Sequence, residues 1–259
     1  MELKLQNKVV IITGSSKGIG KETALLLTQE GAHVILAARN ESTLKEAVQY
    51  IDERTGKVLN YVVMDVTKPE DCQRLVETAI EKFGRLDILI NNAGSAFAQN
   101  FETVSLEDWQ NDLNLKLFGA IQMNQAAIPH LKKQGGAIVN LTAVAGKTPP
   151  ANTSPTSVTR AAGLALTKTL SKDLAPYNIR VNAVCIGLIR SGQIEKRWQN
   201  EAPDQTWEAY ARDPKHNIPL GRIGDTREAA NVIAFLASDA ASYVTGTAVN
   251  IDGGVAPAL

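Results

Sequence analysis

The chain has little cysteine: Cys72 and Cys185 are its two thiols among 259 residues. Two cysteines are too few for a disulfide framework, and they lack the close spacing of a zinc site. We therefore expect a protein of a reducing compartment, the cytoplasm, with no bound metal.

The sequence also lacks an excess of charge of either sign and a long apolar run. Lysine plus arginine and aspartate plus glutamate both number 27, so the formal net charge is zero. Without a basic surplus the composition points to neither a nucleic acid nor a membrane surface as partner. The apolar stretch in MELKLQNKVVIITG is far too short for a signal peptide or a membrane span, so we expect a protein that is not exported.

What is present is the composition of an ordinary globular protein, with 44% hydrophobic and 21% charged residues. A chain of this length fits one α/β domain, and no linker, repeat or low-complexity stretch divides it. We predict a single domain over 1–259.

Short apolar runs rich in β-branched residues alternate with segments of helical periodicity. Strands are expected at 9–13, 32–39, 59–66, 86–94, 137–144, 179–187 and 248–254. Helices are expected at 20–31, 41–51, 69–84, 157–175 and 226–238, with one long helix over 105–136. This alternation predicts an α/β fold, with seven strands in a parallel sheet and helices on both of its faces.

The segment 187–221 breaks this alternation and holds Trp198, Trp207 and Tyr210 among charged residues. It begins at the carboxyl end of a predicted strand, where open α/β sheets bind their ligands. Two interpretations stay open: a lid over a bound ligand, or a peripheral pair of helices packed on the core.

A glycine-rich stretch, TGSSKGIG at 13–20, joins the first predicted strand to the first helix. Glycines let the backbone approach a pyrophosphate, and the helix N-terminus offers unpaired N–H groups to hold it. The same residues could form a tight turn without a ligand, but the strand that precedes them and the helix that follows them favour a nucleotide site. The stretch is not a P-loop, because Ser15 stands where its first glycine belongs and Glu22 follows Lys21.

The spacing of Gly14, Gly18 and Gly20 resembles that of the short-chain dehydrogenase/reductase family. NNAG at 91–94, Asn114 in LNLK and the ending TGTAVNIDGG extend the resemblance over almost the whole chain. It implies a doubly wound, seven-stranded Rossmann fold, a nicotinamide cofactor, and hydride transfer to or from the carbonyl or alcohol of a small molecule. It also implies a homotetramer, with the helix around Asn114 as one contact surface.

The second predicted strand ends at Ala38 and Arg39, and no carboxylate stands there to bond the 2′-hydroxyl of NAD. Arg39 offers a planar fork suited to a 2′-phosphate, and Lys17 could add a second positive charge. Both could also be ordinary solvated surface cations. The missing acid favours NADP(H) over NAD(H).

The resemblance implies further cofactor contacts. Asp65 would meet the adenine, Asn91 would line the cleft, and Ser191 would replace a usual threonine near the carboxamide. The full expected set is Gly14, Ser15, Ser16, Lys17, Gly18, Ile19, Gly20, Arg39, Asp65, Val66, Asn91, Ala93, Gly94, Arg160, Gly187, Ile189 and Ser191.

Members of the family use a serine, a tyrosine and a lysine for catalysis, and alignment places Ala143, Thr156 and Arg160 at these positions. An aliphatic hydroxyl does not titrate near the tyrosine pKa of about 10, so Thr156 is a poor proton donor. Arg160 can still bind ribose hydroxyls, but it does not release a proton. Ala143 has no polar atom with which to polarise a carbonyl.

Few groups could replace the missing tyrosine. Tyr210 and His216 lie in the segment 187–221, and of these we would test Tyr210 as a proton donor. Thr142 could replace the serine if its strand ended before it, because neighbouring strand residues face opposite sides. Ile186 departs from the family as well, since a proline usually precedes the glycine at 187.

Two functions fit these residues. The first is an NADP(H)-dependent oxidoreductase with a nonstandard proton source, in which Asn114 relays a water or Thr156 donates a hydrogen bond, and Arg160 holds the cofactor. The second is an NADP(H)-binding homologue without turnover, in a regulatory or structural role. The resemblance to a family of enzymes favours the first.

Overall fold

The structure is a computed structural model that describes residues 2–258. Its core is a parallel sheet of seven strands in the order β3-β2-β1-β4-β6-β8-β9. The strands are β1 (Val9–Thr13), β2 (His33–Ala38), β3 (Asn60–Val63), β4 (Ile88–Asn91), β6 (Gly136–Ala143), β8 (Ile179–Ile186) and β9 (Ala248–Ile251). The order reverses between β1 and β4, as in a doubly wound sheet, so the predicted Rossmann fold is confirmed.

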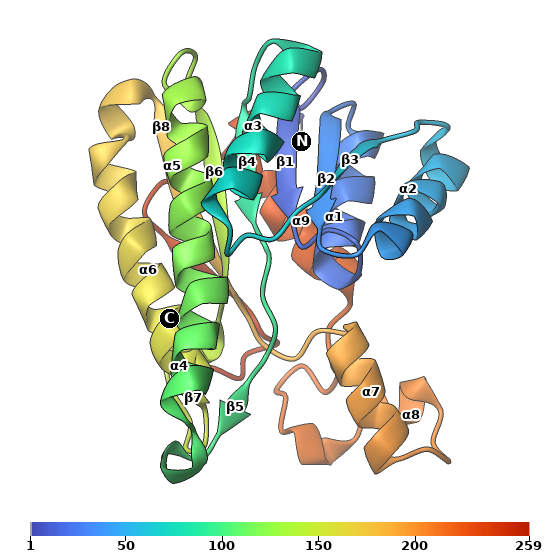
Figure 1. Cartoon of the computed structure of the whole chain (residues 1–259). Coiled ribbons are helices and arrows are strands. Elements are labelled where there is room, and N and C mark those ends of the chain that lie inside the picture. The colour runs from blue at the N-terminus through green and yellow to red at the C-terminus, as the bar shows by residue number, and fades with distance from the viewer. Residues whose placement is uncertain (1, 259) are drawn as a thin grey trace.

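The larger helices are α1 (Gly18–Gln29), α2 (Glu41–Thr55), α3 (Pro69–Phe83), α4 (Leu106–Leu113), α5 (Gly119–Leu131), α6 (Thr156–Asp173) and α9 (Thr226–Ala237). They cover both faces of the sheet (Figure 1). Strand β1 shows why helices must cover both faces. All five of its residues are buried, and their side chains point alternately to the two faces of the sheet. Val10 and Ile12 join one hydrophobic core with α1, α2 and α9, whereas Val9 and Ile11 join a second core with α3 and α5.

The long helix expected over 105–136 is three elements in one column: α4, a π turn at Asn114–Phe118 and α5 (Figure 1). The Gly119 N–H bonds to the Asn114 carbonyl, five residues back rather than four. This wider turn inserts one residue into the helix and changes the faces on which its side chains lie, and such bulges are frequent at functional sites. The helix ends at Leu131, earlier than expected, because Gly135 and Gly136 have φ values of 81° and 156°.

The segment 187–221 contains α7 (Gly192–Glu201) and α8 (Trp207–Ala211), which lie apart from the other helices beyond one end of the sheet (Figure 1). They share a small hydrophobic core with Tyr210, Ala211 and Ile223 at its centre. Opposite them, β5 (Ala98–Gln99) and β7 (Ser154–Pro155) form a short antiparallel ladder. Within residues 2–258, no helix is both long and apolar enough to cross a bilayer.

Helix α9 begins at Asp225 with a capping box, and its Glu228 receives two hydrogen bonds from Arg222. A third comes from the Asp225 backbone N–H at 2.8 Å. The Arg222 hydrogen bonds, followed by the backbone one, lower the pKa of Glu228 from 4.5 to about 2. This carboxylate therefore stabilises the fold above pH 4.5, and the contribution is lost as the pH falls towards 2.

We expect Glu228→Gln to lower the free energy of unfolding more at pH 7 than at pH 2, because the wild-type carboxylate is fully charged at pH 7 and only about half charged at pH 2. Denaturant titrations across this range measure the difference. Glu70→Gln is the matched control, since Glu70 is exposed in the first turn of α3 and shares any helix-dipole effect. Equal pH dependence of the two variants would contradict the prediction.

Candidate active site

A cleft of about 600 Å³ opens at the carboxyl ends of β1, β6 and β8. Its walls are the glycine loop, the turn after β4, the end of β6, the start of α6 and the first part of the segment 187–221. The sequence-predicted residues that line it are Gly14, Ser16, Lys17, Gly18, Ile19, Gly94, Ala143, Thr156, Arg160, Gly187, Ile189 and Ser191. Residues from distant parts of the chain thus meet in one place.

A second hollow of about 260 Å³ adjoins this cleft and shares Gly14, Ser16 and Gly94 with it. It is lined also by Arg39 and Asp65, together with Val66 and Ala93. The Asp65 carboxylate accepts hydrogen bonds from the backbone N–H and the hydroxyl of Thr67, at 3.0 and 2.9 Å. The residues expected around an adenosine therefore lie together at the carboxyl ends of β2 and β3.

The glycine loop and the turn after β4 are held against each other. A Cβ on Gly14, where φ is 64°, would lie 2.8 Å from Ala93 Cα, and one on Gly20 would lie 2.5 Å from Asn92 Nδ2. Asn92 uses this close approach, because its Nδ2 donates to the carbonyls of Thr13 and Gly14 at 2.8 Å each. Sequence reasoning missed Asn92, although it stands in the quoted NNAG.

Other predicted cofactor residues lie inside the protein. The Ser15 hydroxyl donates to the Ile12 carbonyl at 2.8 Å and accepts from the Ala37 N–H at 2.9 Å. Asn91 points into the core, where its Nδ2 donates to Asn140 Oδ1 at 2.9 Å. It lines a cavity of about 20 Å³ behind the cleft, together with Lys116 and Arg160.

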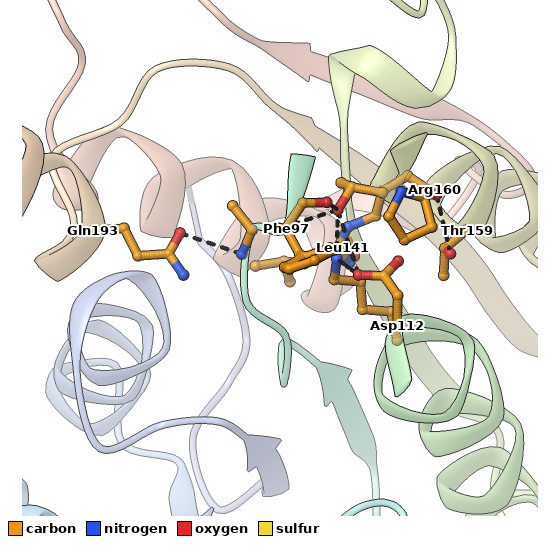
Figure 2. A network of polar contacts seen from close by, with 10 residues as sticks. Phe97, Asp112, Leu141, Thr159, Arg160 and Gln193 are labelled. Carbon is orange, nitrogen blue, oxygen red and sulfur yellow. Dashed lines mark hydrogen bonds and ion pairs between the residues drawn. The ribbon is translucent and has the colours of Figure 1, made fainter. Parts of the chain in front are cut away.

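At the start of α6, the Thr156 hydroxyl lies between two elements. It donates to the Phe97 carbonyl at 2.5 Å and accepts from the Phe97 N–H at 3.2 Å. It also accepts from Lys116 Nζ at 2.7 Å. Figure 2 shows this polar network between α6, the segment that joins β4 to β5, and the helix that carries Asp112.

Lys116 and Asp112 form an ion pair in the interior, with side-chain exposures of 1% and 3%. Lys116 belongs to the π turn and Asp112 to α4, four residues earlier. Burial, the largest effect, lowers the pKa of Lys116; the hydrogen bond to Asp112 raises it and the charge of Arg160 lowers it further. Sequence reasoning did not single out this pair, although its i, i+4 spacing was a signal.

Arg160 lies one turn after Thr156 and donates from Nη1 to the Leu141 carbonyl at 2.6 Å (Figure 2). Its Nη2 faces the turn after β4, since a Cβ on Gly94 would lie 2.9 Å from it. Burial lowers the pKa of Arg160, and the charge of Asp112 opposes this effect. The guanidinium therefore stands at the wall of the cleft beside Gly94.

Next to Thr156, the cleft is lined by Ala143 and Thr142. Ala143 ends β6 and presents a methyl group. Thr142 is still within the strand, and its hydroxyl donates to the Val184 carbonyl at 3.1 Å. Asn114 has its side-chain Oδ1 bonded to Gln110 Nε2 at 2.8 Å, and its carbonyl bonded to Gly119.

The idea of Tyr210 as a proton donor does not agree with the structure. Tyr210 is completely buried in the small core of α7 and α8, and its hydroxyl donates to Glu201 Oε2 at 3.2 Å. Its ring packs on His216, whose Nε2 lies 2.7 Å from the Tyr210 carbonyl. The aromatic residues of this segment pack on each other, which explains their number without a catalytic role.

The sheet defines a Rossmann-type α/β protein, and its cleft lies at the carboxyl ends of the strands, where open α/β sheets bind their ligands. Residues 14–256 match a family model described as Enoyl-(Acyl carrier protein) reductase. The 3-oxoacyl-(acyl-carrier-protein) reductase FabG of Thermotoga maritima is 40% identical over 255 residues, which is 98% of this chain and 99% of the relative. The chain therefore belongs to the short-chain dehydrogenase/reductase family of oxidoreductases.

Two solved structures are similar over nearly their whole length. L-sorbose reductase from Gluconobacter frateurii, complexed with NADPH and L-sorbose, has a TM-score of 0.94 and 33% identity, with all of both chains covered. An NADPH-bound short chain oxidoreductase from Pseudomonas aeruginosa PAO1, described as containing an atypical catalytic center, has a TM-score of 0.92 and 32% identity, with 98% of this chain and 100% of the other covered.

Proposed function

We propose that the protein is an NADP(H)-dependent oxidoreductase that interconverts a carbonyl and an alcohol on a small molecule, with a proton source other than tyrosine. The observation that carries this proposal is the single cleft that joins the glycine loop to Thr156 and Arg160. The similarity to two NADPH complexes supports the choice of cofactor.

The residues present fit a dinucleotide. The close approach at Gly14 and Gly20 leaves the loop backbone free of side chains, and the N-terminus of α1 begins there with unpaired N–H groups. When bound, the nicotinamide would supply or accept the hydride. Arg160 Nη2 can donate to ribose hydroxyls beside Gly94, and the guanidinium holds its charge without releasing a proton.

A second function, an NADP(H)-binding protein without turnover, has its own support. Ala143 presents no donor to polarise a carbonyl, and the Thr156 hydroxyl is already bonded to Phe97. The experiment that separates the two functions is to titrate the purified protein with NADPH and with NADH, and then to follow the reduced nicotinamide band over a panel of carbonyls. NADPH oxidation supports the enzyme, binding without oxidation supports the alternative, and failure to bind either cofactor contradicts both.

Arg39 provides the test of cofactor preference. We expect Arg39→Glu to weaken NADPH binding about ten- to a hundredfold, because a charge-assisted hydrogen bond to the 2′-phosphate is replaced by repulsion. NADH binding should stay within a few fold. Lys172→Glu, at an exposed position on α6, is the control for a change of net charge. Equal loss of both cofactors in Arg39→Glu would contradict an NADP(H) preference.

The homotetramer, the cytoplasmic location and the lid over the cleft stay predictions. The lid is supported by the contribution of Gly187, Ser191 and Gln193 to the cleft wall. Gln193 Oε1 also accepts a hydrogen bond from the Ala96 N–H across the cleft at 3.3 Å.

A further inference from the structure

Lys116 is an ammonium group enclosed in the protein directly behind the cleft. Its side chain is 1% exposed, and two of its hydrogen bonds go to Asp112 Oδ1 and to Thr156 Oγ1, the latter at 2.7 Å. Thr156 lines the cleft itself. A chain of hydrogen bonds therefore runs from an enclosed charged group to the surface on which a substrate would lie.

In the hydrogen-bonded path from Lys116 through Thr156 to the cleft, Lys116 is the group that can gain and lose a proton. Arginine does not release its proton in proteins, and a threonine hydroxyl does not titrate in the working range. Of the described residues, the charged groups that face Lys116 are Asp112 from α4 and Arg160 from α6. Burial and the charge of Arg160 favour the neutral amine, whereas Asp112 favours the ammonium, so these opposing effects poise Lys116 for proton transfer.

We propose that Lys116 is the proton source of the reaction and that the Thr156 hydroxyl passes its proton into the cleft, with Asp112 as the positioning residue. This inference rests on the proposed oxidoreductase function and names the group that replaces the missing tyrosine. Lys116 is the acid in carbonyl reduction and the base in alcohol oxidation.

The proton moves in two linked transfers during carbonyl reduction. As the carbonyl carbon accepts a hydride, its oxygen takes the proton of the Thr156 hydroxyl, and Thr156 Oγ1 takes a proton from Lys116 Nζ. The products are the alcohol, an intact threonine, a neutral lysine amine and the oxidised nicotinamide cofactor that would supply the hydride. After the alcohol leaves, water in the cleft returns one proton along the same path, so that the ammonium is restored.

The hydroxyl must turn for this transfer. Thr156 Oγ1 now donates to the Phe97 carbonyl at 2.5 Å. A rotation about the Cβ–Oγ1 bond would redirect this hydrogen to an oxygen in the cleft, and the two lone pairs of Oγ1 would turn with it. The hydrogen bond from the Phe97 N–H, at 3.2 Å, would then be given up, while a lone pair stays directed at Lys116 Nζ. The Lys116 hydrogen bond is thus already in place for the second transfer.

The first arm of the test needs neither cofactor nor turnover. Lysine Nζ resonances are followed by NMR in the protein labelled with ¹³C and ¹⁵N on lysine, and Lys116 is assigned by its absence from the Lys116→Met spectrum. We expect Lys116 to titrate at lower pH than the exposed lysines, and at still lower pH in Asp112→Asn, which removes the group that raises its pKa. Titration of Lys116 together with the exposed lysines would overturn the inference.

The second arm measures turnover on a carbonyl that the wild-type protein reduces. We expect Lys116→Met to lower kcat by about 10²–10⁴-fold, the range of general acid catalysis, with NADPH affinity within a few fold of wild type. The wild-type rate should fall as the pH rises through the pKa of Lys116, and in Asp112→Asn this fall should begin at lower pH. Lys172→Met is the matched control and should keep the wild-type profile.

Failure of the inference and failure of the proposed function give different results. A Lys116→Met protein that keeps the wild-type rate and pH profile overturns the role of Lys116 while the oxidoreductase stands. A wild-type protein that binds NADPH but does not oxidise it with any carbonyl of the panel overturns the proposed function, and the proton-source role falls with it. If Lys116→Met does not fold, the pH profile of Asp112→Asn decides whether Lys116 is the proton source. An ion pair with a purely structural role would leave the pH dependence of the rate unchanged.

Discussion

Asp112→Ala is expected to lower the free energy of unfolding by about 3–5 kcal/mol, the usual cost of leaving one partner of a buried ion pair unpaired. The variant would leave the Lys116 ammonium enclosed at 1% exposure with the Thr156 hydroxyl as a neutral partner and the positive charge of Arg160 nearby. Urea titration at neutral pH measures the loss. The loss should shrink as the pH rises, because Lys116 then becomes neutral.

The double variant Asp112→Ala, Lys116→Met is the control for this prediction. It removes both charges, so it should recover much of the stability that the single variant loses. A double variant whose loss equals the sum of the two single losses would show that the two side chains are not coupled, and would contradict the ion pair as the cause.

Thr156→Val is expected to lower kcat by about 10²–10⁴-fold, with KM and NADPH affinity changed much less. Valine has nearly the same shape as threonine but no hydroxyl, so the path from Lys116 to the cleft is broken. Thr156→Ser keeps the hydroxyl and should stay within about tenfold of wild type by the same argument. Turnover of Thr156→Val at the wild-type rate would mean that the proton reaches the substrate by another route.

The fold could be predicted because its signals are local. Each strand is a short apolar run, and Gly14 and Gly20 permit backbone approaches that a Cβ would block. The long helix was predicted as one continuous element. The π turn within it adds a single residue, and the hydrophobic periodicity of a few residues does not reveal such an insertion. In the segment 187–221, α7 and α8 have their own small core and the segment also lines the cleft, so the choice between a lid and a peripheral helix pair stays open.

The site could be predicted in position but not in its chemistry. The alignment grouped Thr156, Arg160 and Ala143, and all three line one cleft, while their roles stay predictions. Lys116 and Asp112 were missed, because a charged pair on a helix usually lies on its solvated face. Only the packing of α4 and the π turn against α6 shows that this pair faces inward, and that packing is a tertiary property.

The contact between Thr156 and Phe97 has a mechanical consequence. In the ladder of β5 and β7, Ala98 pairs with Pro155 and Gln99 with Ser154, so Phe97 stands where the next rung would join Thr156. The Thr156 hydroxyl replaces the backbone groups of that pair, since it accepts a hydrogen bond from the Phe97 N–H and donates one to the Phe97 carbonyl. These hydrogen bonds hold one wall of the cleft together as a rigid unit. We therefore expect any widening of the cleft for a bulky ligand to occur at the facing wall around Gln193.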